Sequence, residues 1–206
     1  MVRVLISLEG LPRSCRQAVL KALDTQLDRP EAASPSGFVD QARGLLRRLR
    51  ALRATAGDGG IVLSPDTWAD GVPEDPALGA LYRDLAVQLA GPELCAGVRH
   101  VLIYLRTDPH ETFEAVAQAG SEAKDVTLLS LLALHQRIDR FFSLHPTAVQ
   151  HPFAVERHVI HCPPYTPDNP AELARLVGSV RRLIAAAAEP YIGLKELSLQ
   201  TVQTGN

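Results

Sequence analysis

One loop near the N-terminus has the spacing of a phosphate-binding loop but not its side chains. The apolar run Val4–Leu8 leads into Gly10 and then into a segment with helical periodicity, which predicts a strand, a tight loop and a helix. The phosphate-binding pattern for that frame is Gly, four residues, then Gly-Lys-Ser/Thr, in which the lysine contacts the terminal phosphates and the hydroxyl binds Mg²⁺. The last three positions are here Cys15, Arg16 and Gln17. The strand–loop–helix spacing is therefore kept, while the side chains that would bind phosphate and Mg²⁺ are replaced.

Two interpretations of this loop stay open. Backbone N–H groups at the start of the helix still favour an anion, so the candidate phosphate contacts are Gly10, Arg13, Ser14 and Arg16. Against this, a guanidinium makes different contacts from an ammonium, and Cys15 places a side chain where glycine lets the backbone approach a phosphate. The other interpretation is a strand–turn–helix that uses Gly10 for its geometry alone.

Length and composition predict one compact domain, residues 1–206, with a tail segment from 190 to 206. No apolar run approaches the roughly 20 residues that span a bilayer, so no membrane insertion is expected. The chain begins with a predicted strand rather than a signal peptide, and Cys15, Cys95 and Cys162 are scattered. We therefore expect a reducing compartment, cytosol or nucleus, with no disulfide framework. The net charge of −2 gives no field that attracts nucleic acid.

Predicted strands alternate with helices along the chain. Segments rich in apolar and β-branched residues predict buried strands at Val2–Leu8, Gly60–Ser64, Val98–Leu105 and Ala154–His161. Helical spacing predicts helices at Arg16–Gln26, Val39–Ala54, Pro76–Leu89, Pro109–Gln118, Val126–Leu144 and Pro170–Ala187. Asp108 and Asn169, each followed by a first-turn proline, are predicted to cap the helices that begin at Pro109 and Pro170. The alternation predicts an α/β fold with a parallel sheet of four to five strands and helices on both faces. The tail is expected to form a short irregular or β segment.

A longer stretch allows a comparison with a known family. VLIYLRTDPHETFEAVAQAGSEAKDVTLLSLLALHQRIDRFF contains Ile103-Tyr104-Leu105 at a strand end, a cap at Asp108-Pro109-His110-Glu111, and Leu134-His135 on a later helix. Together with the Glu9-Gly10 loop, these features resemble the deoxynucleoside kinase family over most of residues 3 to 162. The resemblance implies a truncated P-loop-kinase-like fold and shared ancestry, whereas activity has to be argued from the site.

Other parts of the chain depart from that family's pattern. The family's lid carries arginines, each worth about 10³–10⁵ in rate when it acts as an arginine finger, but the matching stretch from Ala115 to Ala123 has none. The family's Glu-Arg-Ser motif is replaced by Pro65-Asp66-Thr67, which leaves Asp66 as a weak metal candidate. The family's catalytic glutamate and base-reading glutamine would correspond to Glu31 and Gln41.

Two side-chain clusters and one thiol complete the candidates. Arg43, Arg47, Arg48, Arg50 and Arg53 lie among leucines at helical spacing, which indicates either a solvated basic face or a contact for nucleic acid or an acidic partner. His158, His161 and Cys162 do not predict a metal site, because neighbours on a strand alternate between faces. Cys15 lies near the N-terminus of a predicted helix, where a thiol pKa can be lowered. Because no partner base is identified for it, no redox role is expected.

The combined changes at loop, metal motif and lid favour a catalytically degenerate member of the family. Such a pseudoenzyme would serve as a structural or interaction subunit in a homo-oligomer or in a larger assembly, such as a viral particle or an enzyme complex, and would need no cofactor. The alternative is a divergent active deoxynucleoside or nucleotide kinase that uses ATP and Mg²⁺, with Arg16 in place of lysine and Asp66 at the metal. A third hypothesis is nucleic-acid binding through Arg43–Arg53, with affinity that falls steeply with salt.

Overall fold

The computed structural model of the chain describes residues 3–12, 15–23, 38–54, 60–64, 75–118, 126–143, 154–163, 169–189 and 199–201. The strands are β1 (Arg3–Gly10), β2 (Gly60–Ser64), β3 (Val98–Arg106), β4 (Ala154–His161) and β5 (Leu199–Thr201). The helices are α1 (Arg16–Leu23), α2 (Phe38–Ala54), α3 (Pro76–Gly97), α4 (Pro109–Gln118), α5 (Leu128–Ser143) and α6 (Pro170–Ala188).

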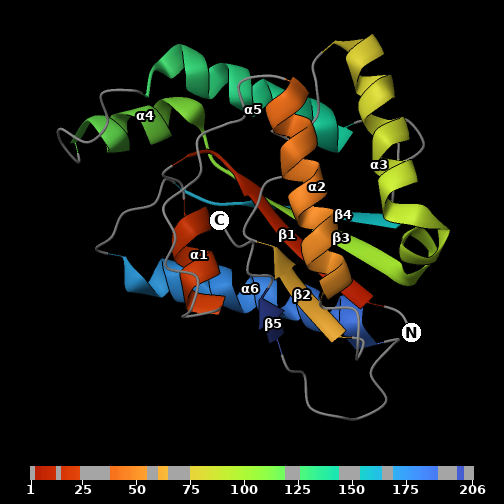
Figure 1. The fold of residues 1–206 in the computed structure, drawn as a ribbon. Coiled ribbons are helices and arrows are strands. Elements are labelled where there is room, and N and C mark those ends of the chain that lie inside the picture. The colour runs from red at the N-terminus through yellow and green to blue at the C-terminus, as the bar shows by residue number, and fades with distance from the viewer. Residues whose placement is uncertain are drawn as a thin grey trace.

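The five strands form one parallel sheet in the order β4-β3-β1-β2-β5, with β1 at its centre (Figure 1). The order of β2, β1, β3 and β4 is one of the common orders of doubly wound α/β sheets. The short strand β5 comes from the tail and pairs with β2. The predicted α/β class, the parallel pairing and the number of strands are therefore confirmed.

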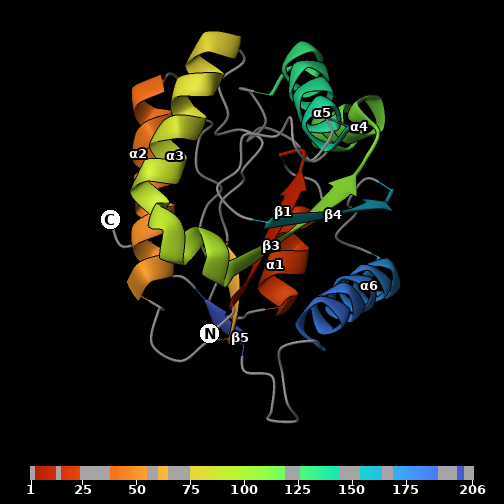
Figure 2. The ribbon, with the colours of Figure 1, turned by 90° about the vertical axis from the view of Figure 1, so that its right-hand side faces the viewer.

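Each face of the sheet carries its own apolar core. Helices α1 and α6 pack side by side against one face, and α2, α3 and α5 cover the other (Figure 2). In β1, Val4, Ile6 and Leu8 belong to the first core, while Leu5 belongs to the second. Because successive strand side chains point to opposite faces, a strand that is buried on both sides reads as a continuous apolar run.

The two predicted caps are present at the starts of α4 and α6. The Asp108 carboxylate accepts hydrogen bonds from the N–H groups of His110 (2.7 Å) and Glu111 (3.2 Å). The Asn169 side chain accepts one from the N–H of Glu172 at 3.1 Å. Each side chain satisfies helix N–H groups that have no partner within the helix. Both helices begin at the prolines where the sequence predicts them.

Helix α3 continues beyond its predicted end at Leu89. Gly91 has a φ of 74° and precedes Pro92, so the helix kinks there and a second segment leads into β3. Proline has no N–H to donate, so the carbonyls before the kink need another donor. The guanidinium of Arg53, at the end of α2, donates to the carbonyl of Leu89 and, at 3.2 Å, to that of Ala90. Neither α3 nor any other described helix is both long and apolar enough to cross a membrane.

Candidate functional site

The carboxyl ends of β1, β3 and β4 meet at one edge of the sheet. The chain leaves β1 toward β2 on one side and leaves β3 toward β4 on the other, so the switch in direction lies between β1 and β3. In doubly wound sheets, ligands bind in the crevice outside the strand ends at such a switch point. Gly10 and Leu105 are register partners at these two ends, and both α1 and α4 begin nearby in the chain. The candidate site is therefore located at this edge.

Arg16, which stands where the phosphate-binding pattern would have its lysine, is buried. The residue is 3% exposed, and its Nε donates a 2.8 Å hydrogen bond to the carbonyl oxygen of Leu8 on β1. A hydrogen bond from a charged group contributes about 1.5–3 kcal/mol to stability. This bond holds the Nε side of the guanidinium against β1. Gly10 is buried at the end of β1, while Arg13 and Ser14 lie outside the described residues.

Cys15, which stands where the phosphate-binding pattern would have its second glycine, points into the protein. It is 1% exposed, belongs to the core under α1 and α6, and its Sγ lies 3.3 Å from the Sγ of Cys162. Cys162 follows β4, and its N–H donates to the carbonyl of Arg106 at 3.0 Å. The hydrogen bond between the thiols, together with burial, raises the pKa of Cys15. The same hydrogen bond lowers the pKa of Cys162 against the opposing effect of burial.

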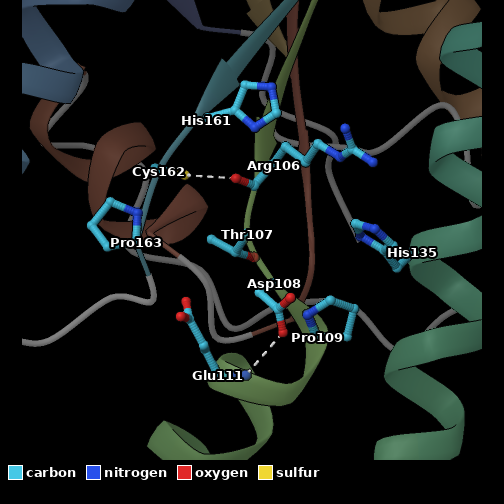
Figure 3. Close-up of a pocket in the computed structure, with 9 residues that line it drawn as sticks. All are labelled: Arg106, Thr107, Asp108, Pro109, Glu111, His135, His161, Cys162 and Pro163. Atoms are coloured by element: carbon cyan, nitrogen blue, oxygen red, sulfur yellow. Dashed lines mark hydrogen bonds between the residues drawn. The ribbon is translucent and has the colours of Figure 1, made fainter.

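An open cavity of about 450 Å³ lies beside the ends of β3 and β4 (Figure 3). Its size is within the range of small-molecule sites. The lining residues are Arg106, Thr107, Asp108, Pro109, Glu111, His135, His161, Cys162 and Pro163. The N–H groups of Glu111 and His110 are already bonded to the Asp108 carboxylate, and these bonds hold the pKa of Asp108 below its usual value. The start of α4 thus brings the carboxylates of Asp108 and Glu111 to the cavity, which Arg106 also lines.

A chain of polar contacts joins β3 to α5 next to this cavity. Tyr104 Oη lies 3.0 Å from His135 Nδ1, and His135 Nε2 lies 3.4 Å from the Asp139 carboxylate. Arg106 forms an ion pair of 2.5 Å with the same carboxylate. Burial, followed by the negative charge of Asp139, raises the pKa of Tyr104 well above its usual value. Since Tyr104 is fully buried, this chain fixes α5 on the sheet and does not offer the phenol to a ligand.

The remaining predicted site residues are not brought together among the described residues. Gln41 is half-buried in the first turn of α2, and Glu31 and Asp66 lie outside the described residues, as does most of the predicted lid. In the basic cluster, Arg43 and Arg50 are exposed, whereas Arg53 binds the α3 carbonyls. Among the described residues, no group of three His, Cys, Asp or Glu side chains could hold a metal ion.

Sequence reasoning missed two contacts at this edge, the Cys15–Cys162 pair and the Arg106–Asp139 ion pair. Both join the end of a strand to an element distant in the chain. The available signal was that Cys15 follows β1 and Cys162 follows β4, which places both at the carboxyl edge of a parallel sheet. Comparison of the sequence with models of known protein families finds no match, and comparison with curated proteins finds none either.

Proposed function

We propose that this chain is a deoxynucleoside-kinase-like protein that no longer transfers phosphate and serves as a structural or interaction subunit of an assembly. The observation that carries the proposal is the position of the Arg16 side chain. Arg16 stands where the phosphate-binding pattern has its lysine, so its guanidinium would have to supply the positive charge. Its guanidinium is buried on the Leu8 carbonyl. Since phosphoryl transfer depends on cations placed on the phosphates, a buried and engaged cation supports a structural role for this loop.

The surroundings of the switch point support the same proposal. Cys15 fills the position where a glycine would let the backbone approach a phosphate, and its side chain packs into the core. On the other side of the switch point, Asp108 caps α4 and Glu111 lines the cavity. These carboxylates disfavour a polyphosphate beside the strand ends, because like charges raise its free energy of binding.

Exposed apolar side chains support a function in protein contacts. Val39 in α2 is 60% exposed, and Leu78 and Leu81 in α3 are 42% and 53% exposed. Both helices lead into parallel strands of the sheet, so both begin at the same end of the molecule (Figure 1). Contiguous exposed apolar patches mark surfaces that contact other proteins, and Leu78 and Leu81 lie one turn apart in α3. The protein partner under this proposal is a second copy or another subunit.

The catalytic part of the proposal is tested by titrating the purified chain with Mg-ATP in a calorimeter up to millimolar concentration. A parallel assay follows phosphoryl transfer from ATP to thymidine and deoxycytidine. We expect neither binding nor transfer. Arg16→Ala and the exposed control Arg43→Ala are titrated in the same way. Binding and phosphoryl transfer by the natural chain that Arg16→Ala abolishes and Arg43→Ala keeps would establish the alternative, an active divergent kinase.

The assembly part is tested separately by sedimentation of the chain and of the Leu78→Lys/Leu81→Lys variant. Self-association that the double variant loses, with its melting temperature kept, supports a homo-oligomer through the start of α3. If both proteins sediment as monomers at all concentrations, the homo-oligomer form of the proposal is wrong.

A further inference from the structure

We propose that Cys15 and Cys162 are a site of reversible oxidation, at which an intramolecular disulfide forms between the start of α1 and the end of β4. The two residues are 147 positions apart in the chain, and the fold brings them together at the carboxyl edge of the sheet. The inference does not depend on the proposed function, since it concerns only the chemistry of two thiols that the fold brings together.

The geometry already brings the sulfur atoms close to bonding distance. Their separation of 3.3 Å has to shorten by about 1.2 Å to reach the length of a disulfide. Cys15 lies in the turn before the first residue of α1, and Cys162 is the first residue after β4. Both residues lie at the ends of regular elements, where one backbone hydrogen bond each is seen, from the Val19 N–H to the Cys15 carbonyl and from the Cys162 N–H to the Arg106 carbonyl. Side-chain rotation and a small loop movement can therefore supply the change.

The two thiols differ in their access to an oxidant, and this difference indicates which of them reacts first. Cys15 is 1% exposed and packs inside the core, whereas Cys162 lines the open cavity beside β3 and β4. A cavity of about 450 Å³ admits a molecule as small as hydrogen peroxide. Cys162 is also the thiol whose pKa is lowered by the hydrogen bond from its neighbour. Cys162 is thus the attacking thiol and Cys15 the resolving one.

The reaction balances with a peroxide as the oxidant. The Cys162 thiolate attacks one oxygen of hydrogen peroxide, the O–O bond breaks, and the products are a sulfenic acid on Cys162 and a hydroxide that takes up a proton to form water. The Cys15 sulfur then attacks the sulfenic sulfur. The S–S bond forms, and the hydroxyl leaves with the Cys15 proton as a second water. A dithiol reductant reverses the reaction by thiol–disulfide exchange.

The bond would connect the altered loop to the opposite side of the switch point. It closes a chain segment of about 148 residues, which in the chain-entropy model places it among the more stabilising crosslinks. In the oxidised protein the start of α1 cannot move away from the end of β4. Oxidation would therefore hold these two elements together at the carboxyl edge of the sheet.

The test is peptide mapping of the full chain after hydrogen peroxide treatment, with free thiols blocked by an alkylating reagent. Trypsin should release a linked pair made of residues 14–16 and 158–175. The intact mass should fall by about 2 Da, and dithiothreitol should restore it. The melting temperature of the oxidised monomer should exceed that of the reduced one by on the order of 10 °C. A Cys95→Ser control should give the same linked pair and the same shift.

Cys15→Ser adds an independent readout, because removal of the resolving thiol should leave a sulfenic acid that dimedone traps on Cys162. If this variant does not fold, peptide mapping of the natural chain and of Cys95→Ser still decides the question. The proposal is overturned if the folded natural chain is oxidised without the linked pair, for example to a sulfinic acid on Cys162 or to disulfides through Cys95. It is also overturned if dimedone labels Cys95 alone in the Cys15→Ser variant.

Discussion

Replacement of Arg16 by methionine separates a structural arginine from a phosphate-binding one. Methionine keeps an unbranched apolar stem in a buried position but has no donor for the Leu8 carbonyl. A hydrogen bond from a charged group is worth about 1.5–3 kcal/mol. Removal of a buried charge recovers part of that loss, because the guanidinium no longer has to be desolvated. We therefore expect the free energy of unfolding to fall by about 1–3 kcal/mol.

For a chain of this length each kcal/mol shifts the melting temperature by roughly 2–4 °C, so the expected decrease is roughly 2–12 °C. Thermal and urea denaturation at pH 7 measure it, each with and without Mg-ATP. Arg43→Met is the matched control. The Arg43 side chain is 73% exposed and pairs with Asp40 at 3.5 Å, and such surface changes usually stay within about 0.5 kcal/mol.

The opposite pattern would refute this reasoning. If Arg16 served to bind phosphate, Arg16→Met would be as stable as the natural chain, and a stabilisation by Mg-ATP would disappear with it. Arg16→Lys sharpens the distinction, since it restores the lysine of the phosphate-binding pattern. We expect Arg16→Lys to be destabilised and to show no response to Mg-ATP.

Two further variants test the elements that frame the cavity. Asp108→Ala should lower the free energy of unfolding by about 0.5–2 kcal/mol at pH 7, whereas Asp108→Asn should keep most of the cap. The pKa of folded Asp108 is below its usual value, so the charged carboxylate stabilises the protein above about pH 4. The stability advantage of the natural chain over Asp108→Asn should be lost as the pH falls through the folded pKa. A difference between these two proteins that does not change in denaturation curves from pH 7 to acid would contradict the assignment. Tyr104→Phe removes the hydroxyl that contacts His135 and should cost about 0.5–1.5 kcal/mol in urea denaturation, with the slope unchanged; an equally stable variant would mean that the hydroxyl does not connect β3 to α5.

The fold was predictable because its elements carry local signals. The helix at Pro109–Gln118 has its predicted bounds since a capping aspartate and a first-turn proline fix its start. The strand at Ala154–His161 also has its predicted bounds. The end of α3 was not predictable in the same way. A proline normally ends a helix, but here the positive φ of Gly91 turns the chain into a second segment.

The candidate site was less predictable because its contacts depend on tertiary structure. Spacing alone identified Arg16 as the residue at the lysine position, but not the direction of its side chain, which is set by the Leu8 carbonyl. Likewise, the sequence places Cys15 and Cys162 at the same edge of the sheet but does not show that α1 and β4 bring them onto the same side. The proposals at this edge therefore rest on packing that no local pattern encodes.

The contact of Arg53 with the kink of α3 has a consequence for local unfolding. The carbonyls of Leu89 and Ala90 in α3 accept hydrogen bonds from the Arg53 guanidinium in α2. If α2 opens, these carbonyls lose their donor, and if α3 opens, the guanidinium loses its acceptors. Regions coupled in this way tend to open as one cooperative unit. In native-state hydrogen exchange, we therefore expect the slow amides of α2 and of the first segment of α3 to share one opening free energy, separate from that of α6 on the opposite face.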